Sequence, residues 1–136
     1  MNDNIVVISG GFDPVHSGHI EYIKAAAELG RVFIGLNSDE WLIRKKGKAF
    51  MPFEERYAVL SQLKNVLCVV PMDDSDGTAI DAIRQAKKMF PHQQIIFANG
   101  GDRTQDNIPE MSEKDVIFKF GVGGENKKNS SSWILQ

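Results

Sequence analysis

Two histidines three residues apart, His16 and His19, follow a short glycine-bearing turn. That turn consists of Gly10, Gly11, Phe12 and Asp13. Imidazoles can donate hydrogen bonds to phosphate oxygens near neutral pH. The glycines let a ligand approach the backbone closely, and a helix start offers free N–H groups and a positive dipole end to an anion. These residue types in this order indicate a site for phosphate or nucleotide chemistry.

A basic segment, residues 44–48, could supply the cations that a phosphate site needs. We expect it to form a mobile loop whose lysines close over phosphates as point charges. A run of charges is usually only a solvated surface. The histidine motif upstream favours the functional interpretation, because bound phosphates require cationic partners. The candidate lysines are Lys45, Lys46 and Lys48.

The histidines lie where an apolar run meets a helical pattern. Residues 5–8 are all Ile or Val, as in a buried parallel strand, and Ile20, Ile23, Ala26 and Ala27 are spaced like one face of a helix. In an α/β sheet such a junction lies at the carboxyl end of a strand, where ligands bind. The spacing therefore places both imidazoles at that edge of the sheet.

Strand and helix patterns alternate along the rest of the chain. We predict strands at 5–9, 31–37, 66–70, 94–98 and 116–120. Helices are predicted at 18–29, from 38–40 onward, at 52–63 and at 78–89. This order predicts one α/β domain over residues 1–136, with a Rossmann-like, doubly wound parallel five-stranded sheet. The polar loops that follow the strands would converge on one ligand.

The bulk composition bounds the functional class. The chain has 136 residues and a net charge of −2, which argues against broad nucleic-acid binding. Its one cysteine, Cys68, cannot form an internal disulfide, so a reducing cytoplasm is the expected compartment. Neither a signal peptide nor a membrane-spanning stretch is evident, and no membrane partner is expected.

Several familiar site patterns are absent. The turn lacks the Gly-x-Gly-x-x-Gly fingerprint of dinucleotide binding and the Gly-Lys-Ser/Thr of a Walker loop. Asp73, Asp74 and Asp76 suggest a calcium loop, but Arg84 or Gln85 stands at the twelfth position where glutamate is required. We therefore interpret this acidic stretch as a loop and helix cap.

The turn and the pair of histidines resemble the core motif of the cytidylyltransferase-like nucleotidyltransferases. In that superfamily a strand is followed by Gly-x-Phe-Asp, two residues, and His-x-Gly-His. Further segments resemble glycerol-3-phosphate cytidylyltransferases and the adenylyltransferase domain of heptose-phosphate enzymes, in the right order over nearly the whole chain. They are residues 35–39, Lys46-Gly47, Pro52, Glu55-Arg56, residues 100–102 and residues 130–132.

The resemblance implies transfer of CMP or AMP from CTP or ATP, with Mg²⁺, to a small phosphorylated alditol or sugar, releasing pyrophosphate. It also implies a homodimer. Under it, His16, His19 and Lys46 are catalytic, the histidines at the transferring phosphate and Lys46 between donor and acceptor phosphates. The implied nucleotide-binding residues are Gly10, Gly11, Phe12, Asp13, Asp102, Arg103, Ser130, Ser131 and Ser132.

Some of the implied roles have alternatives. Asp13 would orient the turn or approach a Mg²⁺-triphosphate, and Arg56 would bind the acceptor phosphate or pair with a carboxylate. Asp39 and Lys48 complete the expected substrate-binding set, while Lys45 or Lys48 could replace Lys46. The family's tail arginine is absent, and its charge would come from Lys127 or Lys128 in the tail, residues 121–136.

Other functions remain to be weighed against this one. Pantetheine-phosphate adenylyltransferases share the motif but have a different context around the second histidine and a longer chain. Class I aminoacyl-tRNA synthetases share the histidines, yet 136 residues cannot hold their tRNA-binding parts. A catalytically silent nucleotide-binding or sensing module is the alternative from another class. The intact His16, His19 and Lys46 argue against it.

Overall fold

Five parallel strands form a single sheet in the computed structural model, which describes residues 3–100 and 108–123. β1 (Ile5–Gly10) lies at the centre, paired with β2 (Arg31–Leu36) on one side and β4 (Ile95–Ala98) on the other. β3 (Val66–Pro71) and β5 (Val116–Lys119) form the two edges. The order is therefore β3-β2-β1-β4-β5, and the strand order reverses at β1.

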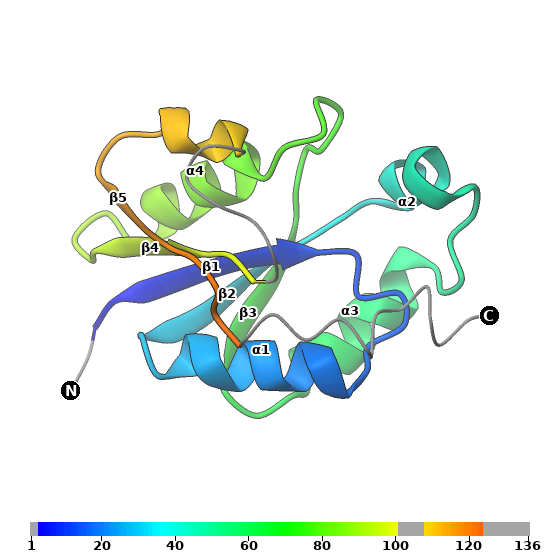
Figure 1. Ribbon diagram of the computed structural model, residues 1–136, viewed down its shortest axis with the longest axis horizontal. Helices are drawn as coiled ribbons and strands as arrows, with labels where there is room; N and C mark the ends of the chain where they lie inside the picture. Colours follow the sequence, from blue (N-terminus) through cyan, green and yellow to red (C-terminus); the bar gives the residue numbers. More distant parts are fainter. Residues whose placement is uncertain (1–2, 101–107, 124–136) are drawn as a thin grey trace.

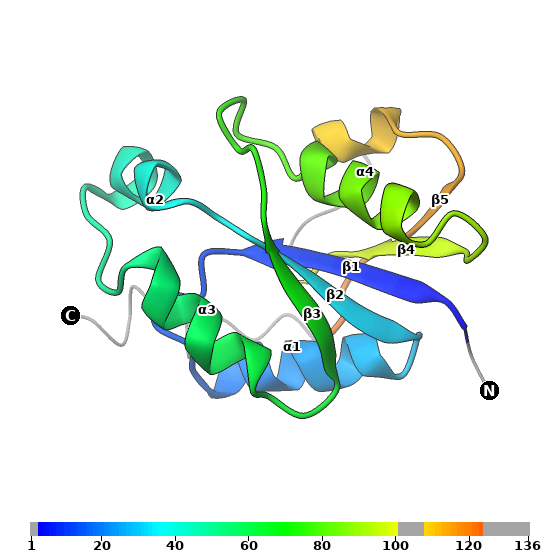
Figure 2. The same ribbon diagram turned by 180° about the vertical axis from the view of Figure 1, so that it is seen from behind.

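Helices cover both faces of this sheet (Figure 1). α1 (Ser17–Ala27) and α3 (Phe53–Ser61) pack on one face, and α4 (Ile80–Met89) with the 3₁₀ helix η1 (Pro109–Ser112) lies on the other. α2 (Asp39–Lys46) lies beyond the carboxyl ends of the strands. The reverse view shows edge strand β3 between α3 and α4 (Figure 2). The expected doubly wound α/β domain is confirmed.

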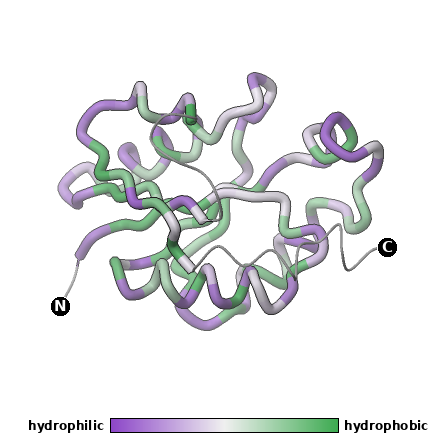
Figure 3. The backbone as a smooth tube through the Cα atoms, in the orientation of Figure 1, coloured by the Kyte–Doolittle hydropathy of each residue, from purple (hydrophilic) through white to green (hydrophobic). Residues whose placement is uncertain are grey.

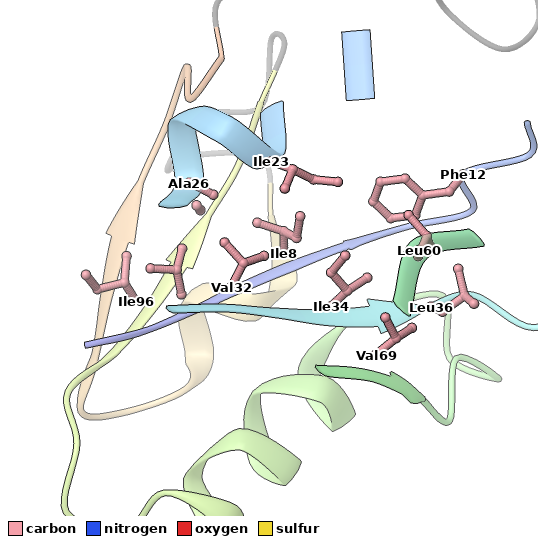
Figure 4. Close-up of a cluster of buried hydrophobic side chains, with 12 residues drawn as sticks. Ile8, Phe12, Ile23, Ala26, Val32, Ile34, Leu36, Leu60, Val69 and Ile96 are labelled. Carbon is pink, nitrogen blue, oxygen red and sulfur yellow. The ribbon is translucent and has the colours of Figure 1, made fainter. Parts of the chain in front are cut away.

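The core consists of two layers because side chains of a strand alternate between the faces of the sheet. Val6 and Ile8 of β1 join the cluster beneath α1 and α3, whereas Ile5 and Val7 join the cluster against α4. Figure 4 shows Ile23 of α1 in the first of these clusters. The hydropathy tube is green along the strands, as expected for strands buried on both faces (Figure 3).

The prediction of a basic loop at residues 44–48 is wrong for residues 44–46. Arg44, Lys45 and Lys46 form the last turn of α2, where cations are favoured by the helix dipole. Gly47 then ends the helix with φ of 89°, a conformation that glycine adopts without steric cost. Among residues 3–100 and 108–123, no helix is long and apolar enough to cross a membrane.

Candidate active site

A cavity of about 370 Å³ opens at the carboxyl ends of β1 and β2, where the sheet topology predicts a ligand site. It lies between α2 and the residues that precede α4. Most of its lining residues come from the turn after β1, from α2 and from the loop that follows β3. They are Ser9, Gly10, Gly11, Phe12, Asp13, His19, Asn37, Trp41, Leu42, Lys45, Lys46, Met72, Gly77, Thr78, Ala79 and Glu110.

The two histidines start α1 together. His16 is the N-cap residue, and its Nδ1 accepts a hydrogen bond from the backbone N–H of Gly18 at 3.0 Å. His19 Nδ1 accepts from the backbone N–H of His16 at 3.2 Å. The two rings stack with centroids 4.0 Å apart, and His19 also contacts the ring of Phe12 at 4.8 Å. The spacing of three residues thus creates a reciprocal cap as well as a paired imidazole surface.

These contacts fix where each imidazole carries its proton. Since both Nδ1 atoms accept hydrogen bonds, both neutral rings bear hydrogen on Nε2. Burial, and to a smaller extent the nearby His16, together lower the pKa of His19 to about 4. Burial also lowers the pKa of His16. His16 Nε2 is buried and has no hydrogen-bond partner among the described residues. Both imidazoles are therefore neutral at pH 7, and His19 is the one of the two that lines the cavity.

Asp13 holds the segment after α2 against the glycine turn. Its carboxylate is buried and accepts hydrogen bonds from the backbone N–H groups of Phe50 and Met51, both at 2.6 Å. Lys46 Nζ lies 3.1 Å from Asp13 Oδ2 and donates to the Asp13 carbonyl oxygen at 2.9 Å. Of the two expected roles of Asp13, this geometry favours orienting the turn.

The three candidate lysines are placed differently from one another. Lys46 lines the cavity and pairs with Asp13, while Lys45 lines it with its ammonium 4.6 Å from the ring centroid of Trp41. Lys48 is exposed and does not line the cavity. Lys45 and Lys46 are therefore the lysines that the described structure brings to the site.

Arg56 joins the backbone segments that surround the site. Its side chain is fully buried, and it donates to the carbonyl oxygens of Met51 at 2.9 Å, Gly11 at 2.9 Å and Asn37 at 2.8 Å. It also pairs with Asp39 at 2.6 Å. Of the two roles expected for Arg56, the structure contains the ion pair with a carboxylate. Neither Arg56 nor Asp39 lines the cavity.

Asp74, from the acidic stretch interpreted above as a loop and helix cap, supports the start of α2. This buried carboxylate accepts from the side-chain amide of Asn37 at 3.0 Å and from the N–H and hydroxyl of Ser38 at 2.7 and 2.8 Å. Ser38 in turn caps α2 through the N–H of Trp41. The loop after β3 therefore orients the helix that carries the two lysines. No group of three or more metal-ligating side chains occurs among the residues described.

Glu110 is a second buried carboxylate near the site, and it lines the cavity. It comes from η1, only 2% of it is exposed, and its Oε2 accepts a hydrogen bond from the backbone N–H of Ala79 at 2.7 Å. Ala79 immediately precedes α4. The remaining expected residues lie outside the described ranges: Asp102, Arg103, Lys127, Lys128, Ser130, Ser131 and Ser132.

Comparison with known proteins places this arrangement in a family. The model of the family described as Cytidylyltransferase-like matches residues 7–117. The chain is 40% identical over 126 residues to the bifunctional protein HldE of Vibrio parahaemolyticus, covering 90% of this chain and 24% of that protein. It is 30% identical to a phosphopantetheine adenylyltransferase of Methanopyrus kandleri, covering 93% of this chain and 85% of the relative.

A solved structure shares the fold. The lipopolysaccharide core biosynthesis protein from Thermoplasma volcanium superposes with a TM-score of 0.60 at 22% identity, covering 85% of this chain and 92% of that one. The chain spans only about a quarter of the length of the HldE proteins it matches. The match of the family model over residues 7–117 includes the glycine turn, both histidines and both cavity lysines. The chain therefore belongs to the cytidylyltransferase-like family of nucleotidyltransferases.

Proposed function

We propose that this chain transfers AMP or CMP from ATP or CTP to a small phosphorylated sugar or alditol and releases pyrophosphate. The observation that carries the proposal is the cavity at the end of β1, where His19 and Lys46 meet the glycine turn. An acceptor phosphate oxygen would form a bond to the α-phosphorus while the bond from that phosphorus to the β-phosphate oxygen breaks. The acceptor is already an anion, so no strong base is required.

The residues of the site would act by positioning and charge stabilisation. Neutral Nε2–H groups of His16 and His19 would donate to phosphate oxygens as charge shifts toward the leaving pyrophosphate. Lys46 would leave Asp13 to contact donor and acceptor phosphates together. Both carboxylate oxygens of Asp13 already accept from backbone N–H groups. We therefore expect Mg²⁺ to enter bound to the triphosphate, as part of the substrate.

Phosphopantetheine is a second candidate acceptor. The relative from Methanopyrus kandleri is named as an adenylyltransferase for it, and 85% of that relative is covered by this chain. Because most of that relative is covered, the longer chain expected of such enzymes does not by itself exclude phosphopantetheine. The 40% identity to HldE and the compact cavity favour the smaller sugar or alditol phosphate.

Pyrophosphate release tests the proposal. Each of the four ribonucleoside triphosphates with Mg²⁺ is incubated with a panel of sugar phosphates, alditol phosphates and phosphopantetheine, and without an acceptor as the control. We expect pyrophosphate from ATP or CTP only when an acceptor phosphate is present. Thermal-shift measurements run in parallel, because a bound nucleotide raises the melting temperature. Nucleotide binding without turnover on any acceptor would favour the sensing module instead.

A further inference from the structure

Two uncharged polar side chains, Ser9 and Asn37, end the apolar stripes that β1 and β2 present to α4. Along β1, Val7 lies in the core cluster against α4, and the period of two places Ser9 next on that face. Along β2, Phe33 lies in the same cluster, and the same period leads to Asn37 four residues later. Both polar residues line the cavity. The sheet therefore offers a ligand polar groups without charge at this edge.

The side-chain amide of Asn37 is held in one orientation. Only 5% of this residue is exposed, and its Nδ2 donates a hydrogen bond to Asp74 Oδ2 at 3.0 Å. A carboxylate only accepts hydrogen bonds, so the NH₂ group faces Asp74 and Oδ1 points away from it. The backbone is held as well, since the N–H of Asn37 donates to the Gly10 carbonyl oxygen at 3.0 Å and its own carbonyl oxygen accepts from Arg56 at 2.8 Å. The direction of Oδ1 is therefore fixed before a ligand arrives.

Both side chains keep an atom that can bind a ligand. Within residues 3–100 and 108–123, no hydrogen bond is made to Asn37 Oδ1 or by the Ser9 hydroxyl. Connected hydrogen bonds strengthen one another, so donation to the Asp74 carboxylate makes Oδ1 a stronger acceptor. The negative charge of Asp74 also disfavours a phosphate at this point. The pair is therefore suited to a hydroxyl or an amine of the ligand.

The position of Asn37 favours the acceptor substrate over the nucleotide. The strand order reverses between β1 and β4, and doubly wound folds bind their nucleotide in the crevice at such a reversal. Asn37 follows β2, on the other side of β1. Met72 lines the cavity from the end of edge strand β3, so the cavity extends away from β4. The group that reaches Asn37 therefore belongs to the second substrate.

We propose that Asn37 and Ser9 form the subsite that recognises the hydroxyl groups of the acceptor. Asn37 Oδ1 accepts the hydrogen of one hydroxyl, and the Ser9 hydroxyl makes a second hydrogen bond to the same polyhydroxy chain. The inference rests on the proposed function and names the part of the acceptor that the sheet side of the cavity binds. An acceptor with an apolar segment in place of that hydroxyl would leave Oδ1 unpaired and would react less efficiently.

The test compares the wild-type chain with Ser9→Ala and Asn37→Ala. Ser9→Ala removes a hydroxyl that makes no hydrogen bond to the described part of the chain, so the melting temperature should not change. Asn37→Ala leaves Asp74 with both hydrogen bonds from Ser38. The acceptor that gives the highest rate in the panel is assayed beside its monodeoxy analogues, at saturating nucleoside triphosphate and Mg²⁺. Ser61→Ala is the matched control, because Ser61 lies on α3 and does not line the cavity.

We expect Asn37→Ala to lower kcat/KM for the full acceptor about tenfold, mainly through KM, and Ser9→Ala to lower it about threefold or more. The analogue that lacks the hydroxyl bound by Asn37 should lose a similar factor with the wild-type chain and little more with Asn37→Ala. A purely structural role of Asn37 would instead lower the rate by the same factor for the full acceptor and for every analogue. The KM for the nucleoside triphosphate should stay within about twofold. Ser61→Ala should match the wild type on every acceptor.

Each contrary result has a distinct meaning. Wild-type kcat/KM of both variants on all acceptors overturns the hydroxyl subsite and leaves the proposed function intact. The same fractional loss by Asn37→Ala on the full acceptor and on every analogue also overturns it, because Asn37 would then act only through the fold. A change confined to the preference among the four nucleotides shows that Asn37 binds the base, which overturns it as well.

The proposal can still be tested if Asn37→Ala does not fold. Ser9→Ala and the wild-type analogue series then decide. Full activity of Ser9→Ala, or a series in which no single hydroxyl matters, overturns the subsite. Absence of turnover by the wild type with any acceptor overturns the proposed function and this inference together.

Discussion

Backbone hydrogen bonds decide which nitrogen of each active-site imidazole carries hydrogen. Both Nδ1 atoms accept from N–H groups of the first turn of α1, which leaves Nε2 of His16 and His19 as the donor. A neutral donor can strengthen its bond as negative charge develops on a phosphate oxygen, and it costs less to bury than a cation. The helix start thus prepares the donors before any substrate arrives.

Removing either imidazole should reduce turnover without unfolding the chain. We expect His16→Ala and His19→Ala each to lower kcat about 10²-fold or more, the size typical of losing one donor to a developing charge. His92→Ala is the matched control, because His92 is exposed in the turn before β4. Pyrophosphate release at saturating substrates measures the effect. Near-full activity of either variant would remove that histidine from the mechanism.

Acid should destabilise the fold through His19. Its pKa falls from 6.5 to about 4 on folding, so the unfolded chain binds the extra proton between these values. Stability contributed by neutral His19 is therefore complete above pH 6.5 and is lost as the pH falls toward 4, by about 3 kcal/mol. Urea unfolding at pH 7 and pH 4 measures it. His19→Asn should show a smaller loss than the wild type, and His92→Asn the same loss.

At the scale of elements, Arg56 joins three segments that are far apart in the chain. It connects α3 to the turn after β1, to the end of β2 and to the segment before α3. Arg56→Met should lower the free energy of unfolding by about 3 kcal/mol or more, because it leaves buried acceptors unpaired. Arg84→Met, at an exposed ion pair, should leave it nearly unchanged.

Chemical denaturation of both variants tests this role. The result also decides between the two expectations for Arg56. If Arg56→Met kept wild-type stability and only raised the KM of the acceptor, the arginine would be a substrate-binding residue. A loss of stability with an unchanged KM for the acceptor in the remaining folded protein would show that the role of Arg56 is structural.

The elements that the sequence predicts well are those with local signals. The sequence predicts β1, β2 and the start of α1 correctly. Their signals, the apolar runs and the histidine motif, consist of residues that are neighbours in sequence. The sequence does not predict the last turn of α2, which consists of Arg44, Lys45 and Lys46, because a solvated loop and a last helical turn both expose cations. The hydrogen-bond partners of Asp74 and Glu110 could not be predicted, because those partners lie more than 30 residues away.

At the scale of the whole molecule, the homodimer implied by the family resemblance stays a prediction. Sedimentation equilibrium of the 136-residue chain should give a mass of twice 15.2 kDa. We expect dimer at micromolar protein concentration with and without nucleotide. A single species of 15.2 kDa throughout that range would show that the chain works as a monomer.

The central position of β1 has a consequence for how activity is lost on heating. Ile5, Val6, Val7 and Ile8 are fully buried, and β1 is paired on both sides. Its amide hydrogens should therefore exchange with solvent only when the whole domain opens. α2, which carries the lysines, has a single buried side chain, Leu42, and is otherwise held by polar contacts, so it should open before the whole domain does. Moderate heat would then release the cations reversibly while the glycine turn and the histidines stay in place.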